Sequence, residues 1–201
     1  MRRYLSAAAL LAVAFVMAAG CGETFTGPAA NPYFVFSFEG SMEGWTKNGY
    51  DLDNPPVSWE VSLSLDRARD GASSVRLFVN NINDKSKIYI ERAFAVDTSA
   101  TYRVGVRYYL ATSDWGQVNL WTLITGATSH PAAAAADLTF QGSTGNGRGS
   151  DVGPVWVYQA YEFDVKSSNT GKIWVQVGVW GNSEFGRSYY LDAVHVSFTR
   201  K

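Results

Sequence analysis

The chain is short of cysteine and of charge, and each shortage excludes a class of protein. Its single cysteine, Cys21, cannot form an intramolecular disulfide, so the hydrophobic core has to hold the fold. Seventeen basic and eighteen acidic residues give a net charge of −1. That balance offers no basic surface for nucleic acid, which we do not expect as a partner. Charged residues make up only 17% of the chain and aromatic residues 14%, which favours a β-rich domain with much ring surface.

The N-terminus has the pattern of an export signal. Arg2 and Arg3 precede an apolar run over 5–19 that is too short for a comfortable membrane span. The small residues 18–20 before Cys21 resemble a bacterial lipobox, in which the cysteine receives lipid and becomes the mature N-terminus. The lipobox usually has leucine three positions before the cysteine, where this chain has Ala18. The alternative is an ordinary signal peptide with an incidental cysteine.

We therefore expect three parts in the chain. Residues 1–20 form a lipoprotein signal peptide, 21–32 a flexible tether rich in Gly, Thr, Pro and Ala, and 33–200 one folded domain. Lipidation at Cys21 would place the exported protein in the cell envelope, anchored to the outer membrane or the cell surface. We expect the domain to be a monomer.

The folded part is predicted to be all-β. The clearest strand is 172–180, where Ile173, Val175, Val177 and Val179 alternate with polar or aromatic residues and form a core face. No segment after the signal has the period of a helix. Residues 125–154, rich in Gly, Ser, Thr and Ala, are predicted to form a long loop. These features indicate an antiparallel β-sandwich of the jelly-roll type. The predicted strands are 34–38, 57–65, 74–80, 87–96, 101–110, 117–124, 155–165, 172–180 and 188–198.

Several strands place rings, amides and guanidinium groups on their predicted non-core faces. Flat rings pack against the C–H faces of sugars, and amide or guanidinium groups pair with sugar hydroxyls. If these strands share a sheet, their outer face suits a polysaccharide. The alternative is that some of these rings fill the core or lie under the long loop, as we expect for Trp45 and Trp59. The candidate carbohydrate-binding residues are Arg107, Tyr109, Asn119, Trp121, Trp174, Gln176 and Trp180.

Three motifs, in this order along the chain, resemble bacterial carbohydrate-binding modules of the cellulase/xylanase-associated type, which have the galactose-binding-like jelly-roll fold. They are 38–46, with a Phe-Glu pair and a later Gly-Trp, the turn 70–75, and the closing strand 189–194. The resemblance implies sugar binding without catalysis. It also implies a structural calcium ion bound by Glu39 and Asp192, with Asp70, Ser73 and backbone carbonyls of that turn completing the site. Hard cations prefer such oxygen ligands.

The competing classes are an enzyme on the same fold and a protein-binding surface scaffold. A glycoside hydrolase needs two placed carboxylates, and the acidic residues predicted on strand faces are scattered. A polysaccharide lyase would use His or Tyr beside Arg and Gln, for which Arg107, Tyr109 and Gln176 are available. His195, however, is expected on a terminal strand, away from the aromatic set. We therefore expect a non-catalytic module, with the jelly-roll lyase or hydrolase and the scaffold as alternatives.

Overall fold

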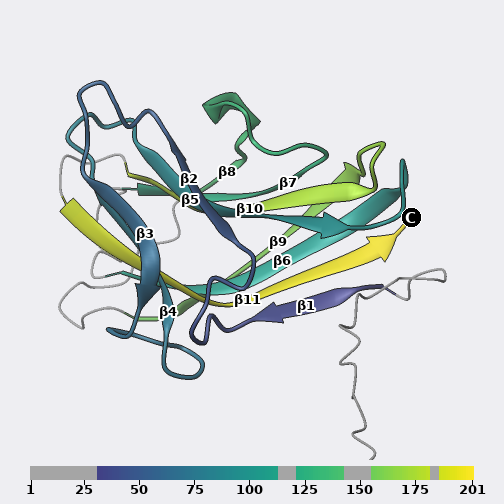
Figure 1. Ribbon diagram of the computed structural model, residues 1–201, viewed down its shortest axis with the longest axis horizontal. Helices are drawn as coiled ribbons and strands as arrows, with labels where there is room; N and C mark the ends of the chain where they lie inside the picture. Colours follow the sequence, from purple (N-terminus) through teal and green to yellow (C-terminus); the bar gives the residue numbers. More distant parts are fainter. Residues whose placement is uncertain (1–30, 113–120, 143–154, 182–185) are drawn as a thin grey trace, which may run out of the picture. The chain divides into compact units, whose positions relative to one another are not determined.

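The computed structural model describes residues 31–112, 121–142, 155–181 and 186–201, and these form two stacked antiparallel sheets (Figure 1). The six-stranded sheet contains β1 (Tyr33–Phe36), β3 (Trp59–Ser64), β4 (Ser74–Asn80), β6 (Thr101–Thr112), β9 (Val157–Lys166) and β11 (Gly186–Arg200). The five-stranded sheet contains β2 (Thr46–Tyr50), β5 (Lys87–Ala95), β7 (Trp121–Thr128), β8 (Phe140–Gln141) and β10 (Lys172–Gly181).

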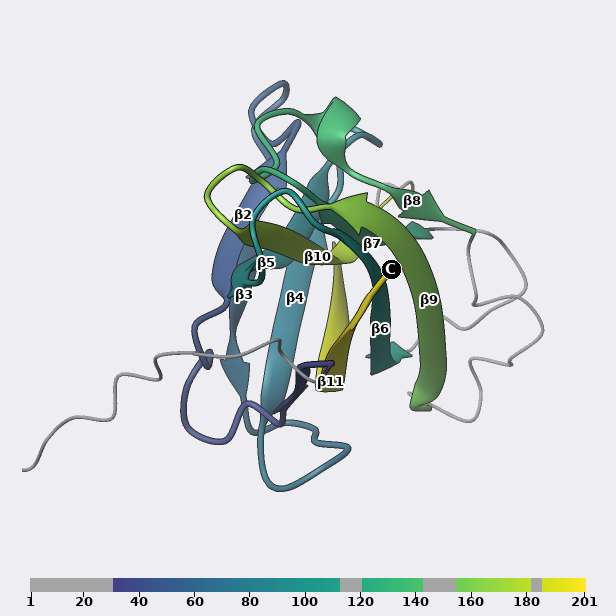
Figure 2. The ribbon, with the colours of Figure 1, turned by 90° about the vertical axis from the view of Figure 1, so that its right-hand side faces the viewer.

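The order of the strands confirms the predicted jelly-roll sandwich. The six-stranded sheet runs β3-β4-β11-β6-β9, with β1 also paired to β11, and the five-stranded sheet runs β2-β5-β10-β7-β8. Neighbours in each sheet are mostly distant in sequence, and every pairing is antiparallel. Figure 2 shows β9 curving along the edge of its sheet, beyond β6.

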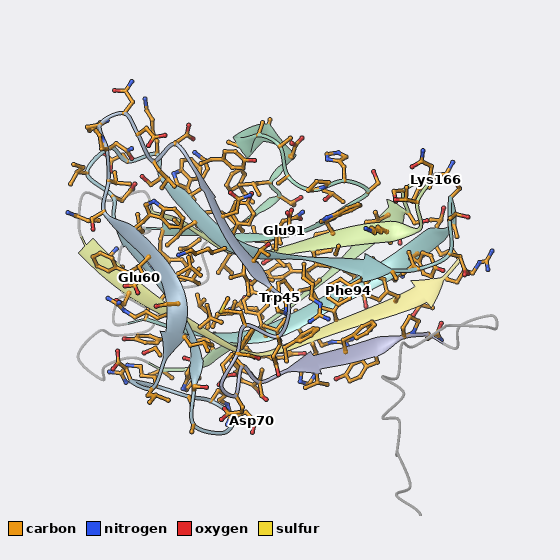
Figure 3. All side chains as sticks on the ribbon, in the orientation of Figure 1. Trp45, Glu60, Asp70, Glu91, Phe94 and Lys166 are labelled. Atoms are coloured by element: carbon orange, nitrogen blue, oxygen red, sulfur yellow. The ribbon has the colours of Figure 1, made fainter. Side chains whose placement is uncertain are left out.

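The core lies between the sheets and follows the predicted alternation. Ile173, Val175, Val177 and Val179 of β10 are all fully buried. Trp45 and Phe94 lie between the two layers (Figure 3), with their ring centroids 6.0 Å apart. The prediction that Trp45 belongs to the core is therefore confirmed.

The predicted long loop over 125–154 is only partly correct. Strand β7 continues to Thr128, and β8 adds a further short strand that pairs with it. Between them lies η1 (Ala135–Asp137), a single turn of 3-10 helix. Within the described ranges, no helix is long and apolar enough to cross a membrane. Residues 143–154, the signal peptide, the tether up to residue 30, Cys21 and Asn119 lie outside the described residues.

Candidate functional site

The outer face of the five-stranded sheet carries three of the predicted ligand residues. On β10, Trp174, Gln176 and Trp180 alternate with the buried valines and therefore point away from the core. The pairing with β5 places Trp174 opposite Ala93 and Gln176 opposite Glu91.

A covering segment, residues 129–139, lies on the middle of this outer face. Figure 1 shows its η1 turn above the five-stranded sheet, on the side away from the other layer. The Tyr50 hydroxyl donates to the carbonyl oxygen of Ala132 at 2.7 Å, and the Ala132 N–H donates to Glu91 Oε1 at 2.9 Å. Ala132 and Leu138 also form a small apolar cluster with Tyr89 and Ile124 of the sheet. Hydrogen bonds and apolar contacts thus hold the covering segment in place.

Gln176 supports this cover and is not exposed to a ligand. It lies on the outer face but its exposed fraction is 0%. Its Nε2 donates to Glu91 Oε1 at 2.8 Å and to Thr128 Oγ1 at 2.9 Å. The predicted role of Gln176 as a sugar contact is therefore wrong in this structure, because the covering segment excludes solvent from it.

The covering segment divides the outer face into two ends. Trp174 lies at one end and Trp180 at the other, six residues apart on the same strand. At about 3.3 Å per residue this is a separation of roughly 20 Å. The two rings therefore do not form one continuous platform, and each end has its own surroundings.

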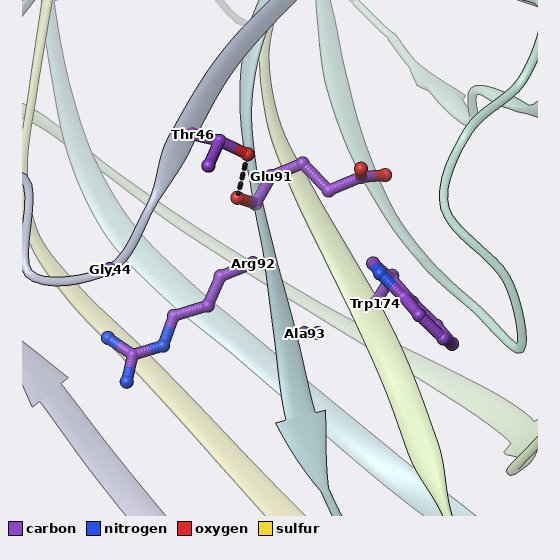
Figure 4. Close-up of a pocket in the computed structure, with 6 residues that line it drawn as sticks. All are labelled: Gly44, Thr46, Glu91, Arg92, Ala93 and Trp174. Atoms are coloured by element: carbon purple, nitrogen blue, oxygen red, sulfur yellow. Dashed lines mark hydrogen bonds between the residues drawn. The ribbon is translucent and has the colours of Figure 1, made fainter. Parts of the chain in front are cut away.

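At the first end, the Trp174 ring borders an open depression of about 390 Å³ (Figure 4). Cavities from about 300 Å³ upward are typical of small-ligand sites. Glu91 reaches this depression from β5, and its side chain is nearly buried. The Thr46 hydroxyl donates to the Glu91 carbonyl oxygen at 3.1 Å and fixes β2 beside the depression. The residues that line it are Gly44, Thr46, Glu91, Arg92, Ala93 and Trp174.

At the second end, Trp180 is held against its neighbours. Its indole Nε1 donates to the Asp84 carbonyl oxygen at 3.3 Å, and its ring packs edge-on against Phe140 with centroids 5.3 Å apart. The Lys87 ammonium lies 5.0 Å from the ring centroid and is also paired with Asp51 at 2.5 Å. These contacts engage both the ring and the N–H of Trp180.

Trp121 does not lie on the outer face, so its predicted position is wrong. It is 1% exposed, faces the core and packs against Tyr189 with ring centroids 5.4 Å apart. In the alternation of the predicted strand 117–124, Ile124 lies on the face opposite Trp121, and its aliphatic side chain is typical of a core face, which predicts Trp121 on the surface. Ile124 is instead buried on the outer face, under Ala132 and Leu138 of the covering segment. Because the covering segment buries the aliphatic Ile124 on the outer face, the sequence pattern predicted the two faces of β7 the wrong way round.

Arg107 and Tyr109 belong to β6 and therefore to the six-stranded sheet. They flank the buried Tyr108 and point to the outer face of that sheet, on the opposite side of the sandwich from Trp174. The predicted single ligand face is therefore wrong. His195, expected on a terminal strand away from the aromatic set, lies on β11, where the strand register places it opposite Arg107.

The predicted calcium ligands gather around the loop between β3 and β4, residues 65–73. Glu39 Oε1 accepts from the N–H groups of Ala72 and Ser73 at 2.9 and 3.1 Å, and the Ser73 hydroxyl donates to the Phe38 carbonyl oxygen. Asp192 Oδ2 accepts from the N–H groups of Arg69 and Asp70 at 2.6 and 3.0 Å. Burial raises the pKa of the Asp192 carboxyl, although these N–H donors, with that of Ala193, favour its ionised form.

This loop turns N–H groups, rather than the expected carbonyls, toward the two carboxylates. Among the residues with described positions, no group of three or more His, Cys, Asp or Glu side chains has the geometry of a metal site. Through these hydrogen bonds the carboxylates tie the loop to the segment that follows β1 and to β11. A calcium ion at Glu39, Asp70, Ser73 and Asp192 is not tested by this arrangement and stays a prediction.

The sequence reasoning missed some residues of the Trp174 end. Lys172 is exposed and precedes Trp174 by two residues, so the same alternation that placed Trp174 could have found it. Thr46 and Gly44 offered no such signal, because β2 was not predicted as a strand. Only the pairing of β2 with β5 brings them to the depression.

Comparison with known proteins shows the fold and no more. No family model matches the chain, and no curated protein matches it. Among solved structures, it is similar to the K3 cleaved adhesin domain of Lys-gingipain from Porphyromonas gingivalis, with a TM-score of 0.52 and 13% identity over 84% of this chain and 98% of that one. The xylan-binding domain of CBM 22 gives 0.47 and 18%, over 85% and 96% of the two chains. TmCBM61 in complex with β-1,4-galactotriose gives 0.42 and 13%, over 78% and 88%.

Proposed function

We propose that this domain binds a polysaccharide, without cleaving it, in the depression beside Trp174. The observation that carries the proposal is a partly exposed indole ring at the rim of an open depression that also contains a nearly buried carboxylate. The ring offers an apolar face to the C–H groups of a sugar. The Glu91 carboxylate and the Thr46 hydroxyl offer acceptors to sugar hydroxyls.

The chemistry of the depression favours binding over cleavage. Hydrolysis needs two carboxylates on either side of the scissile bond, and Glu91 is the one acidic residue among those that line the depression. Its Oε1 is also engaged by the N–H of Ala132 and by the Gln176 amide. Two of the similar structures are described as a xylan-binding domain and as a galactotriose complex. Their TM-scores are below 0.5, so the proposal rests on the site and not on them.

Membrane anchoring belongs to the same proposal. The small residues before Cys21 support a lipid attached to that cysteine, which would hold the binding domain at the cell envelope through the tether. A binding module fixed in this way would retain polysaccharide at the membrane surface.

Affinity electrophoresis through gels with neutral polysaccharides such as xylan and galactan tests the function. We expect the wild-type protein to be retarded and Trp174→Ala to migrate freely. Loss of an aromatic anchor often costs more than about 2 kcal/mol of binding, and each 1.4 kcal/mol is about tenfold in affinity. Trp180→Ala is the matched control, since it removes the same ring from the same strand at the other end of the face, and it should remain retarded. Thermal unfolding of each variant shows that it is folded.

Three results would contradict this proposal. Equal retardation of Trp174→Ala and wild type would remove the depression as the site. New reducing ends or unsaturated products that absorb ultraviolet light would make the protein an enzyme. No retardation by any polysaccharide would favour the protein-binding scaffold.

A further inference from the structure

The outer face of the six-stranded sheet carries a second group of chemically distinctive residues. The register places Arg107 of β6 between His195 of β11 and Ala160 of β9. The adjacent row has Gly105 in the same strand, between Ser197 and Glu162. Gly105 and Ala160 have little or no side chain, so few side-chain atoms project from the sheet between its larger residues.

A pair of tyrosines forms one side of this face. Tyr109 and Tyr158 are opposite each other on β6 and β9, with ring centroids 5.4 Å apart and planes inclined by 54°. Tyr158 is 50% exposed, which is high for a large ring. The Arg69 guanidinium lies 4.6 Å from the centroid of Tyr109, so cation and rings form one cluster.

The position of Arg69 follows from its backbone. Its N–H donates to the buried carboxylate of Asp192 at 2.6 Å, and the next N–H, of Asp70, donates to the same oxygen at 3.0 Å. These bonds fix the loop against the bulge in β11, where the register shifts between Asp192 and His195. The loop therefore holds Arg69 over Tyr109, which lies on the same face of β6 as Arg107 and two residues from it.

Two guanidinium groups of this face, those of Arg69 and Arg107, lack carboxylate partners among the described residues. Other arginines nearby are paired, including Arg103 with Asp164 at 3.2 Å and Arg76 with Glu60 at 3.2 Å. In the part of the chain that the structure describes, the side chains of Arg69 and Arg107 form no ion pair and no hydrogen bond. Two cations without carboxylate partners, beside one exposed and one partly exposed tyrosine ring, are complementary to a ligand that has both carboxylates and apolar ring faces.

We propose that this face binds an acidic polysaccharide through the uronate carboxylates of its sugars. Arg107 and Arg69 pair with the carboxylates, and Tyr109 and Tyr158 pack against the sugar rings. His195, which contacts the Tyr33 hydroxyl through Nδ1, lies beside Arg107 and offers its second ring nitrogen to a hydroxyl. This site is on the opposite side of the sandwich from the Trp174 depression and goes beyond the function proposed there.

Affinity electrophoresis of the full chain in polygalacturonate and in alginate tests the site. The matched probe is polygalacturonate whose carboxyl groups have been reduced to alcohols, which keeps the sugar backbone and removes the charge. We expect retardation by at least one acidic polymer, little by the reduced polymer, and weaker binding at higher salt. Arg107→Gln should raise the dissociation constant about tenfold, because it removes a charge-assisted hydrogen bond.

Three variants make the result specific. Arg103→Gln is on the same strand and the same outer face, but its guanidinium is already paired, so it should bind like the wild type. Tyr158→Ala removes an exposed ring and should weaken binding without loss of thermal stability. Trp174→Ala should keep its affinity for the acidic polymer, which separates this site from the neutral-glycan site. The proposal is overturned if neither acidic polymer retards the protein, if the reduced polymer retards it equally, or if Arg107→Gln and Tyr158→Ala both bind like the wild type.

Discussion

Gly178, near the centre of β10, leaves no room for an added methyl group. It lies between Tyr89 of β5 and Ile124 of β7. A Cβ at this position would lie 2.5 Å from the Cα of Tyr89 and would also collide with the carbonyl oxygen of Ile88. Both obstacles are backbone atoms of a paired strand, so no side-chain rotation relieves them. β5 and β10 would have to separate, which would strain the sheet under the covering segment.

We expect Gly178→Ala to destabilise the domain by about 3 kcal/mol, at the upper end of the usual cost of overpacking. For a domain of this size, 1 kcal/mol corresponds to about 2–4 °C in Tm, so the expected fall is about 6–12 °C. Thermal unfolding followed by circular dichroism measures it. Gly142→Ala is the control, because no atom lies within 4 Å of its added Cβ, and its Tm should stay within about 2 °C. An unchanged Tm for Gly178→Ala would refute the close strand contact.

Three further predictions concern the anchor, the metal and the covering segment. Cys21→Ala should release the protein from the membrane fraction or leave it unprocessed, and identical fractionation of variant and wild type would contradict lipidation. If calcium binds at Glu39 and Asp192, a chelator should lower the Tm of the wild type, because the ion binds only the native state; an equal effect on Asp192→Ala would exclude Asp192 as a ligand. The N–H groups of Ala133 and Ala134 lower the pKa of the Asp137 carboxyl to which they donate. The ionised Asp137 carboxylate therefore stabilises the folded domain fully above the unfolded pKa of about 3.9, and this stabilisation is lost as the pH falls through the lowered pKa of the folded state. NMR titration should give the Asp137 carboxyl a pKa below that of an unfolded aspartate, and the amide chemical shifts of Ala133 and Ala134 should titrate with it. In Asp137→Asn, acid should leave those two amide shifts unchanged. An ordinary aspartate pKa for Asp137 would contradict the contact.

The fold was predictable because its signal is local. Alternation along β10 identified the buried face of that strand correctly, from Ile173 to Val179, since each side chain's direction depends only on its own position. The turn motifs separated the strands well enough to predict a sandwich. The short strands β2 and β8 were missed because two to five polar or mixed residues have no clear period.

The candidate site was less predictable because its residues meet through non-local contacts. Ile124 has the side chain of a core residue, and only the covering segment explains why it lies on an outer face. Gln176 has the pattern of an exposed residue, yet hydrogen bonds to Glu91 and Thr128 bury it. Neither outcome follows from the alternation of a single strand, because residues 129–139 have no pattern that reveals where they pack.

The division of the strands between two sheets has the largest consequence for function. The packed sheets are about 10 Å apart and their outer side chains extend further, so the outer faces of a sandwich point to opposite sides. Trp174 lies on one of these faces and Arg107 on the other. One stretch of a glycan chain lying flat on a sheet therefore cannot contact both residues. It follows that Trp174→Ala and Arg107→Gln must affect glycan affinity independently of each other. If each variant instead lost affinity for the same polymer to the same extent, the loss would be one of folding and not of recognition, and their unfolding midpoints would have to fall together.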